Sequence, residues 1–232
     1  MRHRTATFVR NRVLLTFCVA HIAREQYSRL FERLADRSDP IGEPTALQLE
    51  DAACRWIVET DAACTGLLRV IRFVQRTARD FALQAVAPLV ARMEETGKFP
   101  SRLVKQMAEV GLLGLVTPRK YGGSDLGFLA RTVAIQEISR VSAAAGISLQ
   151  VHHMASAAMA DWGSKEQKER YLPKFSSGEY FGTCAMTEPT GGSDMLGMAT
   201  TARPAGGGYA LNGSKCFITN AHLAQAPVII AK

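Results

Sequence analysis

The chain of 232 residues is long enough for one or two domains with a substantial hydrophobic core. Hydrophobic residues make up 47% of it and charged residues 21%, the balance of a globular protein, and no apolar run approaches the ~20 residues needed to cross a bilayer. The net charge of +7 is spread along the chain through arginines, which disfavours a dedicated nucleic-acid-binding protein. We therefore expect no membrane and no nucleic-acid partner.

The first 67 residues differ in pattern from the rest of the chain. Five arginines precede the first acidic residue, Glu25, as in a transit peptide, and Val13–Ala20 resembles the short apolar core of a secretory leader. No clear cleavage site follows either pattern. The preferred interpretation is an N-terminal extension of loose helices, interrupted by a proline-containing linker at 39–44.

Apolar periodicity predicts helices over the next hundred residues. Apolar side chains recur at intervals of three and four from Ile71 onward, and Pro88 is expected to kink that first helix. Ser101 is a candidate N-cap, and Ser164 with Gln167 has the capping-box pattern that opens a short helix. The predicted helices cover 71–89, 101–110, 129–141 and 142–161, with a short one starting at 164.

After Pro173 the pattern changes to short apolar runs separated by Gly-rich turns, which is typical of strands. The pair Asn212-Gly213 predicts a hairpin turn. Because helices come first and strands follow, and no G-x-G-x-x-G follows a strand, we predict an α+β fold and no Rossmann site. The predicted strands cover 180–186, 198–203, 209–211, 216–218 and 228–231.

The cysteines point to a reducing, cytoplasmic compartment. All five lie outside C-x-x-C pairs, and their odd number argues against a disulfide framework. Cys184 and Cys216 occupy strand-like apolar settings and are expected to be small buried residues. No set of residues has the spacing of a zinc site, so we predict no bound metal.

Two segments carry the functional signal. The sequence TEPTGGSD at 187–194 gathers hydroxyls and glycines around Pro189, which predicts a turn with backbone N–H groups open to a ligand. The sequence LNGSKCFITN at 211–220 predicts a turn and a short strand that ends in the hydroxyl of Thr219. Each pattern alone is common in loops, whereas together they predict a platform for a planar, anionic cofactor.

These segments resemble the two β-domain signatures of the acyl-CoA dehydrogenase family, the first over CAMTEPTGGSDMLG at 184–197 and the second over 211–220. The similarity continues upstream through 77–82, 120–123 and 163–168 and so covers 68 to 232 in the family's order. It implies an all-α N-terminal domain followed by a partial, antiparallel β-barrel-like domain. The implied divisions are an unmatched extension at 1–67, the helical domain at 68–179 and a truncated middle domain at 180–232.

The resemblance also implies an FAD site. Thr187 would meet the pyrimidine side of the isoalloxazine, and Gly192 and Ser193 would lie near the ribityl–pyrophosphate. Ser193 would also approach the pantetheine arm of an acyl-CoA. Thr219 is the candidate hydroxyl at flavin N5, while Phe217 replaces a tryptophan common in relatives and lacks its N–H donor. The implied cofactor-binding residues are Cys184, Ala185, Met186, Thr187, Gly192, Ser193, Phe217, Ile218 and Thr219.

The implied activity is FAD-dependent α,β-dehydrogenation of an acyl-CoA in fatty acid metabolism. Electrons would leave to an electron-transfer flavoprotein, and the enzyme would be a homo-oligomer, in the mitochondrial matrix if eukaryotic. The reaction needs a carboxylate base, which relatives place in a C-terminal helical domain. Because the chain stops at Lys232 within the β-domain, we assign no catalytic residue, and we expect Glu188 to brace its loop.

Several alternatives remain at this stage. The same scaffold could serve a flavin-dependent oxidase or monooxygenase, or the chain could be a non-catalytic remnant. We expect these 232 residues alone to retain little or no FAD. For His152 and His153, a packed or surface pair is preferred over contact with an acyl pocket.

Overall fold

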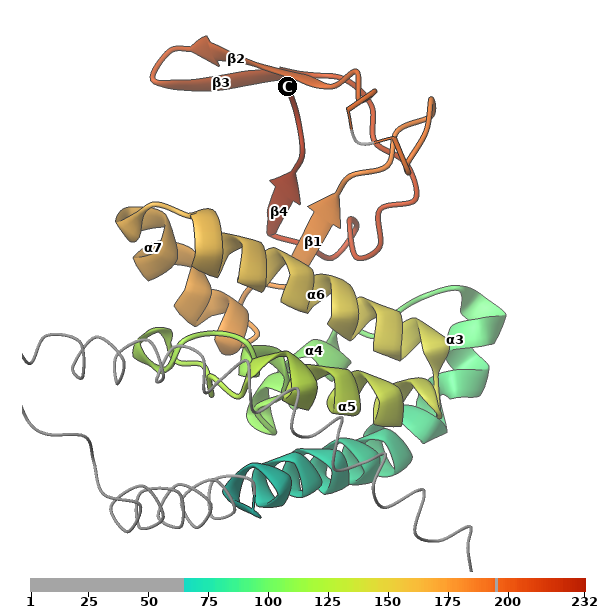
Figure 1. Ribbon diagram of the computed structural model, residues 1–232. Helices are drawn as coiled ribbons and strands as arrows, with labels where there is room; N and C mark the ends of the chain where they lie inside the picture. The colour runs from blue at the N-terminus through green and yellow to red at the C-terminus, as the bar shows by residue number, and fades with distance from the viewer. Residues whose placement is uncertain (1–64, 195) are drawn as a thin grey trace, which may run out of the picture. The chain divides into compact units, whose positions relative to one another are not determined.

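The computed structural model describes residues 65–194 and 196–232. Nearly all the described residues belong to one compact unit, Arg69–Lys232 (Figure 1). The predicted extension therefore lies outside the described residues, apart from its last three positions. Within the described part, no helix is long and apolar enough to span a membrane.

The first described helix confirms the predicted buried face and the predicted interruption. Residues 65–81 are α-helical, with Val74 and Ala78 buried. The helix then widens into a π-turn, η1 (Ala82–Val86), and tightens into a 3₁₀ turn, η2 (Ala87–Leu89). Pro88 lies in η2, where its missing N–H and its bulky ring break the regular hydrogen-bond pattern.

The remaining helices follow the expected order. They are α3 (Val90–Thr96), α4 (Arg102–Glu109), η3 (Leu112–Gly114), η4 (Arg119–Tyr121), α5 (Gly127–Ser139), α6 (Ala143–Trp162) and α7 (Lys165–Ser176). The capping box of α7 is confirmed, since the Ser164 hydroxyl accepts from Gln167 N and the Gln167 side chain accepts from Ser164 N. Ser101 does precede α4, but its side chain makes no capping hydrogen bond.

The helical core lies between the first helix, α4, α5 and α6, and its largest wholly buried side chains include Leu103, Met107, Ile138 and Leu149. A buried carboxylate links two of these helices. Glu137 on α5 accepts hydrogen bonds from Gln75 (2.7 Å) and from Arg79 (2.9 and 3.0 Å). These hydrogen bonds, chiefly those from Arg79, lower the pKa of Glu137 and keep it ionised.

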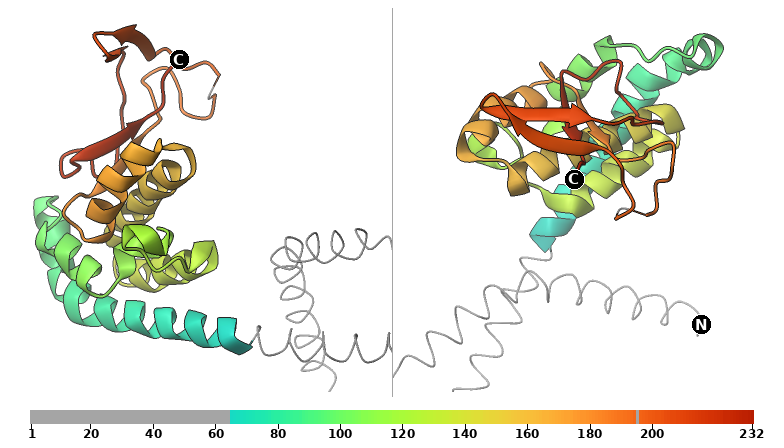
Figure 2. Two further views of the ribbon diagram at one scale, coloured as in Figure 1. Left: turned by 90° about the vertical axis from the view of Figure 1, so that its left-hand side faces the viewer. Right: turned by 90° about the horizontal axis from the view of Figure 1, so that it is seen from above.

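Four strands form two pairs. β1 (Gly182–Ala185) runs parallel to β4 (Ala226–Ile229), and β2 (Thr201–Ala205) runs antiparallel to β3 (Gly208–Asn212). β1 and β4 lie against α6 (Figures 1 and 2). The expected antiparallel pairing therefore holds only for β2 and β3. The expected barrel-like arrangement is not confirmed, since the described residues form two separate strand pairs and no closed sheet.

Two local predictions were wrong for backbone reasons. The hairpin turns at Gly206-Gly207, whose φ values of 56° and 83° suit a tight turn between twisted strands, and not at Asn212-Gly213. Gly213 instead allows a close approach, since a Cβ there would lie 2.7 Å from the Thr200 Cα. Residues 216–218 form no strand, because Phe217 has a φ of 56°, outside the β region.

Candidate cofactor site

The two segments singled out by their sequence run side by side. The Cys216 N–H donates to the Thr187 carbonyl (3.0 Å), and the Thr183 hydroxyl donates to the Thr219 carbonyl (2.6 Å). The end of the first segment (Thr187) thus faces the start of the second (Cys216), and the start of the first (Thr183) faces the end of the second (Thr219). The segments 183–187 and 216–219 therefore lie antiparallel and adjacent, as a shared cofactor wall requires.

A buried ion pair holds this junction. Lys215 donates to the Glu188 carboxylate (2.8 Å) and to the Met186 carbonyl (2.9 Å), so it crosses from one segment to the other. Glu188 is 4% exposed and also accepts from the backbone N–H groups of Ala199 (2.6 Å) and Thr200 (3.0 Å). The hydrogen bond from Lys215, followed by those from the 199–200 segment, lowers the pKa of Glu188.

This environment gives Glu188 a bracing role. Its two carboxylate oxygens accept hydrogen bonds from three donors, and its lowered pKa makes it a weak proton acceptor. The expectation that it supports the loop, and is no general base, agrees with this geometry.

The loop after Glu188 exposes backbone donors. Glu188 and Gly191 exchange two backbone hydrogen bonds of 3.0 Å each and so close a tight turn. Gly192 follows against Thr187, since a Cβ at 192 would lie 3.2 Å from the Thr187 Cγ2. Within the described residues, the N–H groups of Gly192 and Ser193 donate to no protein acceptor. Both residues are exposed, so these donors can reach an oxyanion.

The second segment presents an aromatic ring. Phe217 is 92% exposed and has a positive φ, an uncommon conformation for a bulky residue. Next to it, Ile218 and Thr219 are half-buried. The exposed ring and the strained backbone together make this turn a candidate ligand surface.

Asn220 fixes that strained turn to the helical domain. It is buried, has a φ of 67°, and its side-chain amide donates to the carbonyls of Ser148 (2.8 Å) and Gly182 (3.2 Å). Asparagine tolerates this left-handed conformation better than most residues. One side chain therefore joins the second segment to both α6 and β1.

His152 makes a second link between α6 and β1. The Gly182 N–H donates to its Nδ1 (3.1 Å), which leaves Nε2 as the protonated nitrogen that donates to the Leu113 carbonyl (3.2 Å). The ring stacks on Phe181 and meets Phe175 edge-on. Complete burial lowers the pKa of His152 to about 4, so the ring is neutral at physiological pH.

His153 is equally buried, and its Nε2 lies 2.8 Å from the Leu112 carbonyl. Burial, followed by the neighbouring His152, lowers its pKa to about 3. These contacts support packed roles for both histidines and rule out a surface pair.

The buried histidines predict a loss of stability in mild acid. The folded-state pKa of His152 is about 4, below its ordinary value of 6.5, so between these values the unfolded chain binds the additional proton. The unfolding free energy should therefore fall by about 2 kcal/mol per buried histidine from pH 7 to pH 5. Urea denaturation at both pH values measures this.

His152→Gln should reduce this pH dependence, because it removes one of the two buried imidazoles. Equal slopes for the parent chain and His152→Gln would contradict the assignment of a buried, neutral His152.

The structure brings the sequence-predicted residues together unevenly. The Thr187 carbonyl accepts from Cys216 N in the 216–219 segment, and Gly192 lies against the Thr187 side chain. Ser193 is exposed on the loop. In β1, Ala185 is buried and Cys184 is half-buried, where burial raises the pKa of its thiol. Sequence reasoning missed Lys215, Asn220 and His152. Of these three, only Lys215 had a visible sequence signal, since it is a charged residue within the otherwise apolar and small-residue motif LNGSKCFITN.

The chain belongs to the acyl-CoA dehydrogenase family. Residues 71–179 match the family model described as acyl-CoA dehydrogenase, N-terminal domain, and residues 183–232 match the one described as acyl-CoA dehydrogenase, middle domain.

Individual relatives agree with this assignment. An acyl-CoA dehydrogenase of Bacillus subtilis (strain 168) is 42% identical over 159 residues, which are 68% of this chain and 42% of the relative. Mitochondrial isovaleryl-CoA dehydrogenase of Bos taurus is 38% identical over 179 residues, 76% of this chain and 42% of the relative. The chain thus spans about two fifths of either relative.

A solved structure shares the fold. The glutaryl-CoA dehydrogenase from Mycobacterium smegmatis, in complex with FADH2, superposes with a TM-score of 0.66 at 31% identity. The match covers 70% of this chain and 42% of that one.

Proposed function

We propose that this chain forms the flavin-binding part of an enzyme that catalyses FAD-dependent α,β-dehydrogenation of an acyl-CoA thioester. The observation that carries the proposal is the antiparallel contact of 183–187 with 216–219. Membership of the acyl-CoA dehydrogenase family supports it, as does a related structure in complex with FADH2. The domain division at 68–179 and 180–232 belongs to the same proposal.

The residues present suit a flavin. Cys184 to Thr187 and Phe217 to Thr219 would border the isoalloxazine from the two adjacent segments. The exposed N–H groups of Gly192 and Ser193 would meet the ribityl–pyrophosphate, where backbone donors bind phosphate oxygens well. Ser193 would also approach the pantetheine arm of the substrate. The orphan donors and the exposed ring of Phe217 are the structural features that fit the cofactor.

FAD, when bound, accepts the hydride that leaves the β-carbon of the acyl group. The chain's own task is to orient the reacting groups and exclude water around them. The α-proton requires a separate carboxylate, and Glu188 is unsuited to that role because Lys215 and backbone donors stabilise its ionised form. We place the base in a C-terminal helical domain and regard the four strands as part of a larger, barrel-like β-domain.

The remaining parts of the proposal concern partners and setting. An electron-transfer flavoprotein would take the electrons, and the active enzyme would be a homo-oligomer in fatty acid metabolism. The compartment would be the cytoplasm, or the mitochondrial matrix in a eukaryote, as the description of the bovine relative suggests. Acyl-CoA thioesters are the proposed substrate class.

The test is anaerobic reduction of the gene product that includes this chain. We expect a yellow protein with one FAD per chain whose visible absorbance bleaches on addition of a short-chain acyl-CoA. A colourless protein, or one that no acyl-CoA bleaches, would contradict the dehydrogenase. Rapid reoxidation of the reduced flavin by oxygen would instead identify an oxidase or monooxygenase.

The substitution Gly192→Val is expected to weaken FAD binding without destabilising the fold. A Cβ added at 192 would lie 3.2 Å from the Thr187 Cγ2 and 3.3 Å from the Thr187 hydroxyl oxygen. A branched side chain would therefore cover that hydroxyl and crowd the expected pyrimidine edge. We expect FAD affinity to fall at least about tenfold while the melting temperature changes by less than about 2 °C, because the residue is exposed. Flavin fluorescence titration measures the first effect and calorimetry the second.

The matched control is Thr190→Val on the same loop, also exposed. It should retain the parental affinity. If both variants bind FAD as the parent protein does, the loop does not contact the flavin.

A further inference from the structure

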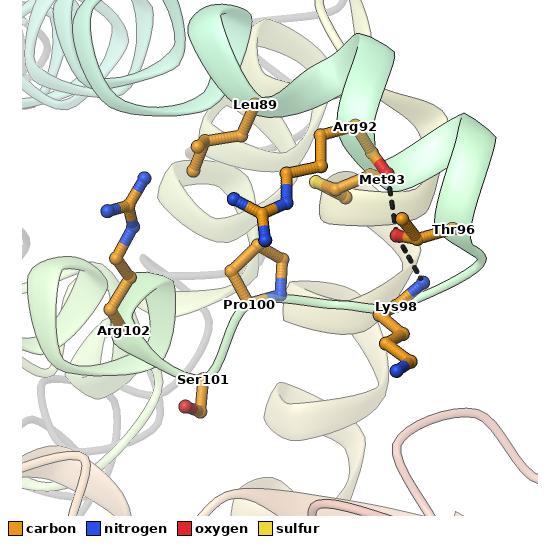
Figure 3. A pocket seen from close by; sticks show the side chains of 8 residues that line it. All are labelled: Leu89, Arg92, Met93, Thr96, Lys98, Pro100, Ser101 and Arg102. Carbon is orange, nitrogen blue, oxygen red and sulfur yellow. Dashed lines mark hydrogen bonds between the residues drawn. The ribbon is translucent and has the colours of Figure 1, made fainter.

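A surface cavity of about 410 Å³ lies between α3 and the start of α4 (Figure 3). Leu89, Met93 and Pro100 supply its apolar lining. Arg92 and Arg102 extend their guanidinium groups into the same gap, whereas the ammonium group of Lys98 points away from it (Figure 3). The cavity is remote in sequence from the segments assigned to the flavin.

The charge of this cavity is entirely positive. Three of its lining residues are cations, and none is an aspartate or glutamate. Among the residues that the structure describes, neither Arg92 nor Arg102 takes part in an ion pair. Both arginines are exposed and no acidic side chain lines the cavity, so an anion between their guanidinium groups would meet only positive charge.

The N-terminus of α4 adds to the positive potential. Arg102 is the first residue of the helix, the first turn holds no acidic side chain, and Ser101 makes no capping hydrogen bond. A helix N-terminus carries a partial positive charge, so an arginine there is electrostatically unfavourable. The N–H groups of Leu103 and Val104 already donate to the carbonyls of Pro100 (2.9 Å) and Ser101 (3.1 Å). An oxyanion would therefore be held chiefly by the Arg102 guanidinium and the positive end of the helix.

The cavity walls are held in place without a ligand. Gly97, with a φ of 64°, ends α3, and its N–H donates to the Met93 carbonyl (2.9 Å). The Thr96 hydroxyl donates to the Arg92 carbonyl (2.6 Å) and accepts from Lys98 N (3.3 Å), as Figure 3 shows. Phe99 stacks against Phe181 and anchors the connecting segment.

We propose that this cavity binds a small ligand through a phosphate or carboxylate group held by Arg92 and Arg102. The planar guanidinium fork matches both oxyanions, with two parallel N–H···O bonds for each arginine. The apolar lining of Leu89, Met93 and Pro100 would contact the rest of the ligand. The inference stands on the cavity alone and is independent of the proposed flavin chemistry.

The test is a titration of the ¹⁵N-labelled chain with sodium phosphate and with sodium succinate, followed by NMR. Sodium chloride at matched ionic strength is the reference. We expect saturable shifts at the amides of Ser101, Arg102 and Leu103, with a dissociation constant on the order of 1 mM. Saturation by phosphate alone assigns a phosphate ligand, saturation by succinate alone a carboxylate ligand, and saturation by both the shared oxyanion chemistry.

Variants distinguish anion binding in this cavity from a general attraction of anions to the basic surface. Arg92→Gln and Arg102→Gln should each weaken binding about tenfold, and the double variant should show no saturable shift. Lys105→Gln removes an exposed cation from the same helix, outside the cavity, and should change affinity less than about twofold. Equal shifts with chloride, or parental binding by the double variant, would overturn the proposal.

Discussion

Replacement of Lys215 by methionine is expected to lower the melting temperature by roughly 10 °C and to abolish FAD binding. Methionine preserves much of the apolar stem but removes the ammonium group that pairs with Glu188 (2.8 Å) and holds the Met186 carbonyl (2.9 Å). The Glu188 carboxylate would then remain buried without its cation, directly between the two cofactor segments. Calorimetry measures the first effect, and the flavin content of the gene product that includes this chain, reconstituted with FAD, measures the second.

Lys165→Met provides the matched control. Lys165 also pairs with a glutamate, Glu169, but at 4.0 Å and with both side chains largely exposed. Exposed pairs of this kind contribute little, so its melting temperature should change by less than about 2 °C. If Lys215→Met unfolds at the same temperature as this control and keeps its flavin, the buried pair does not organise the site.

The same ion pair predicts a dependence on acid. The pKa of Glu188 is lowered from its ordinary value of 4.5, so its contribution to stability is complete above that value and is lost as pH falls through the folded-state pKa. Lys215→Met should reduce this acid-dependent loss below pH 4.5, because its main cause is gone. The buried histidines contribute equally to both proteins, so the difference between the parent chain and Lys215→Met reports on Glu188 alone.

Asn220→Ala is the second substitution with a large expected effect, about 3 kcal/mol of unfolding free energy. It removes the two hydrogen bonds to the buried carbonyls of Ser148 and Gly182 and forces alanine to adopt a φ of 67°. The 216–219 segment would lose its attachment to α6 and β1. We therefore expect FAD affinity to fall at least about tenfold, measured by fluorescence titration beside urea denaturation.

Asn220→Gly separates the two causes. Glycine accepts the left-handed conformation at no steric cost, so it should recover about 1 kcal/mol relative to alanine and leave the hydrogen-bond loss. Asn212→Ala, an exposed asparagine at the end of β3, is the control and should be nearly neutral. Parental stability in Asn220→Ala would show that the amide does not hold the turn.

Much of the helical domain could be predicted because its signals are local. The apolar spacing around Val74 and Ala78 predicted the first helix, and Pro88 predicted its interruption. Ser164 with Gln167 predicted the start of α7. The strands were harder, because their pairing depends on contacts distant in sequence. Nothing local distinguishes the parallel pairing of β1 with β4 from an antiparallel one.

The two segments carry visible turn and hydroxyl patterns, from which we predicted that they lie next to each other, and the contacts at 183–219 and 187–216 bring them side by side. The roles of Thr187 and Thr219 toward a flavin stay predictions. The residues that hold the two segments, Lys215 and Asn220, act through partners from 27 to 72 positions away. The hairpin was misplaced because two turn patterns, Gly206-Gly207 and Asn212-Gly213, competed locally.

A crystal structure of the FAD-loaded gene product that includes this chain would test directly whether both segments contact the flavin. The expected result is an isoalloxazine ring within about 4 Å of both Thr187 and the Phe217–Thr219 segment. A ring bound elsewhere, or in contact with one segment only, would show that the segments 183–187 and 216–219 contact each other but form no flavin wall.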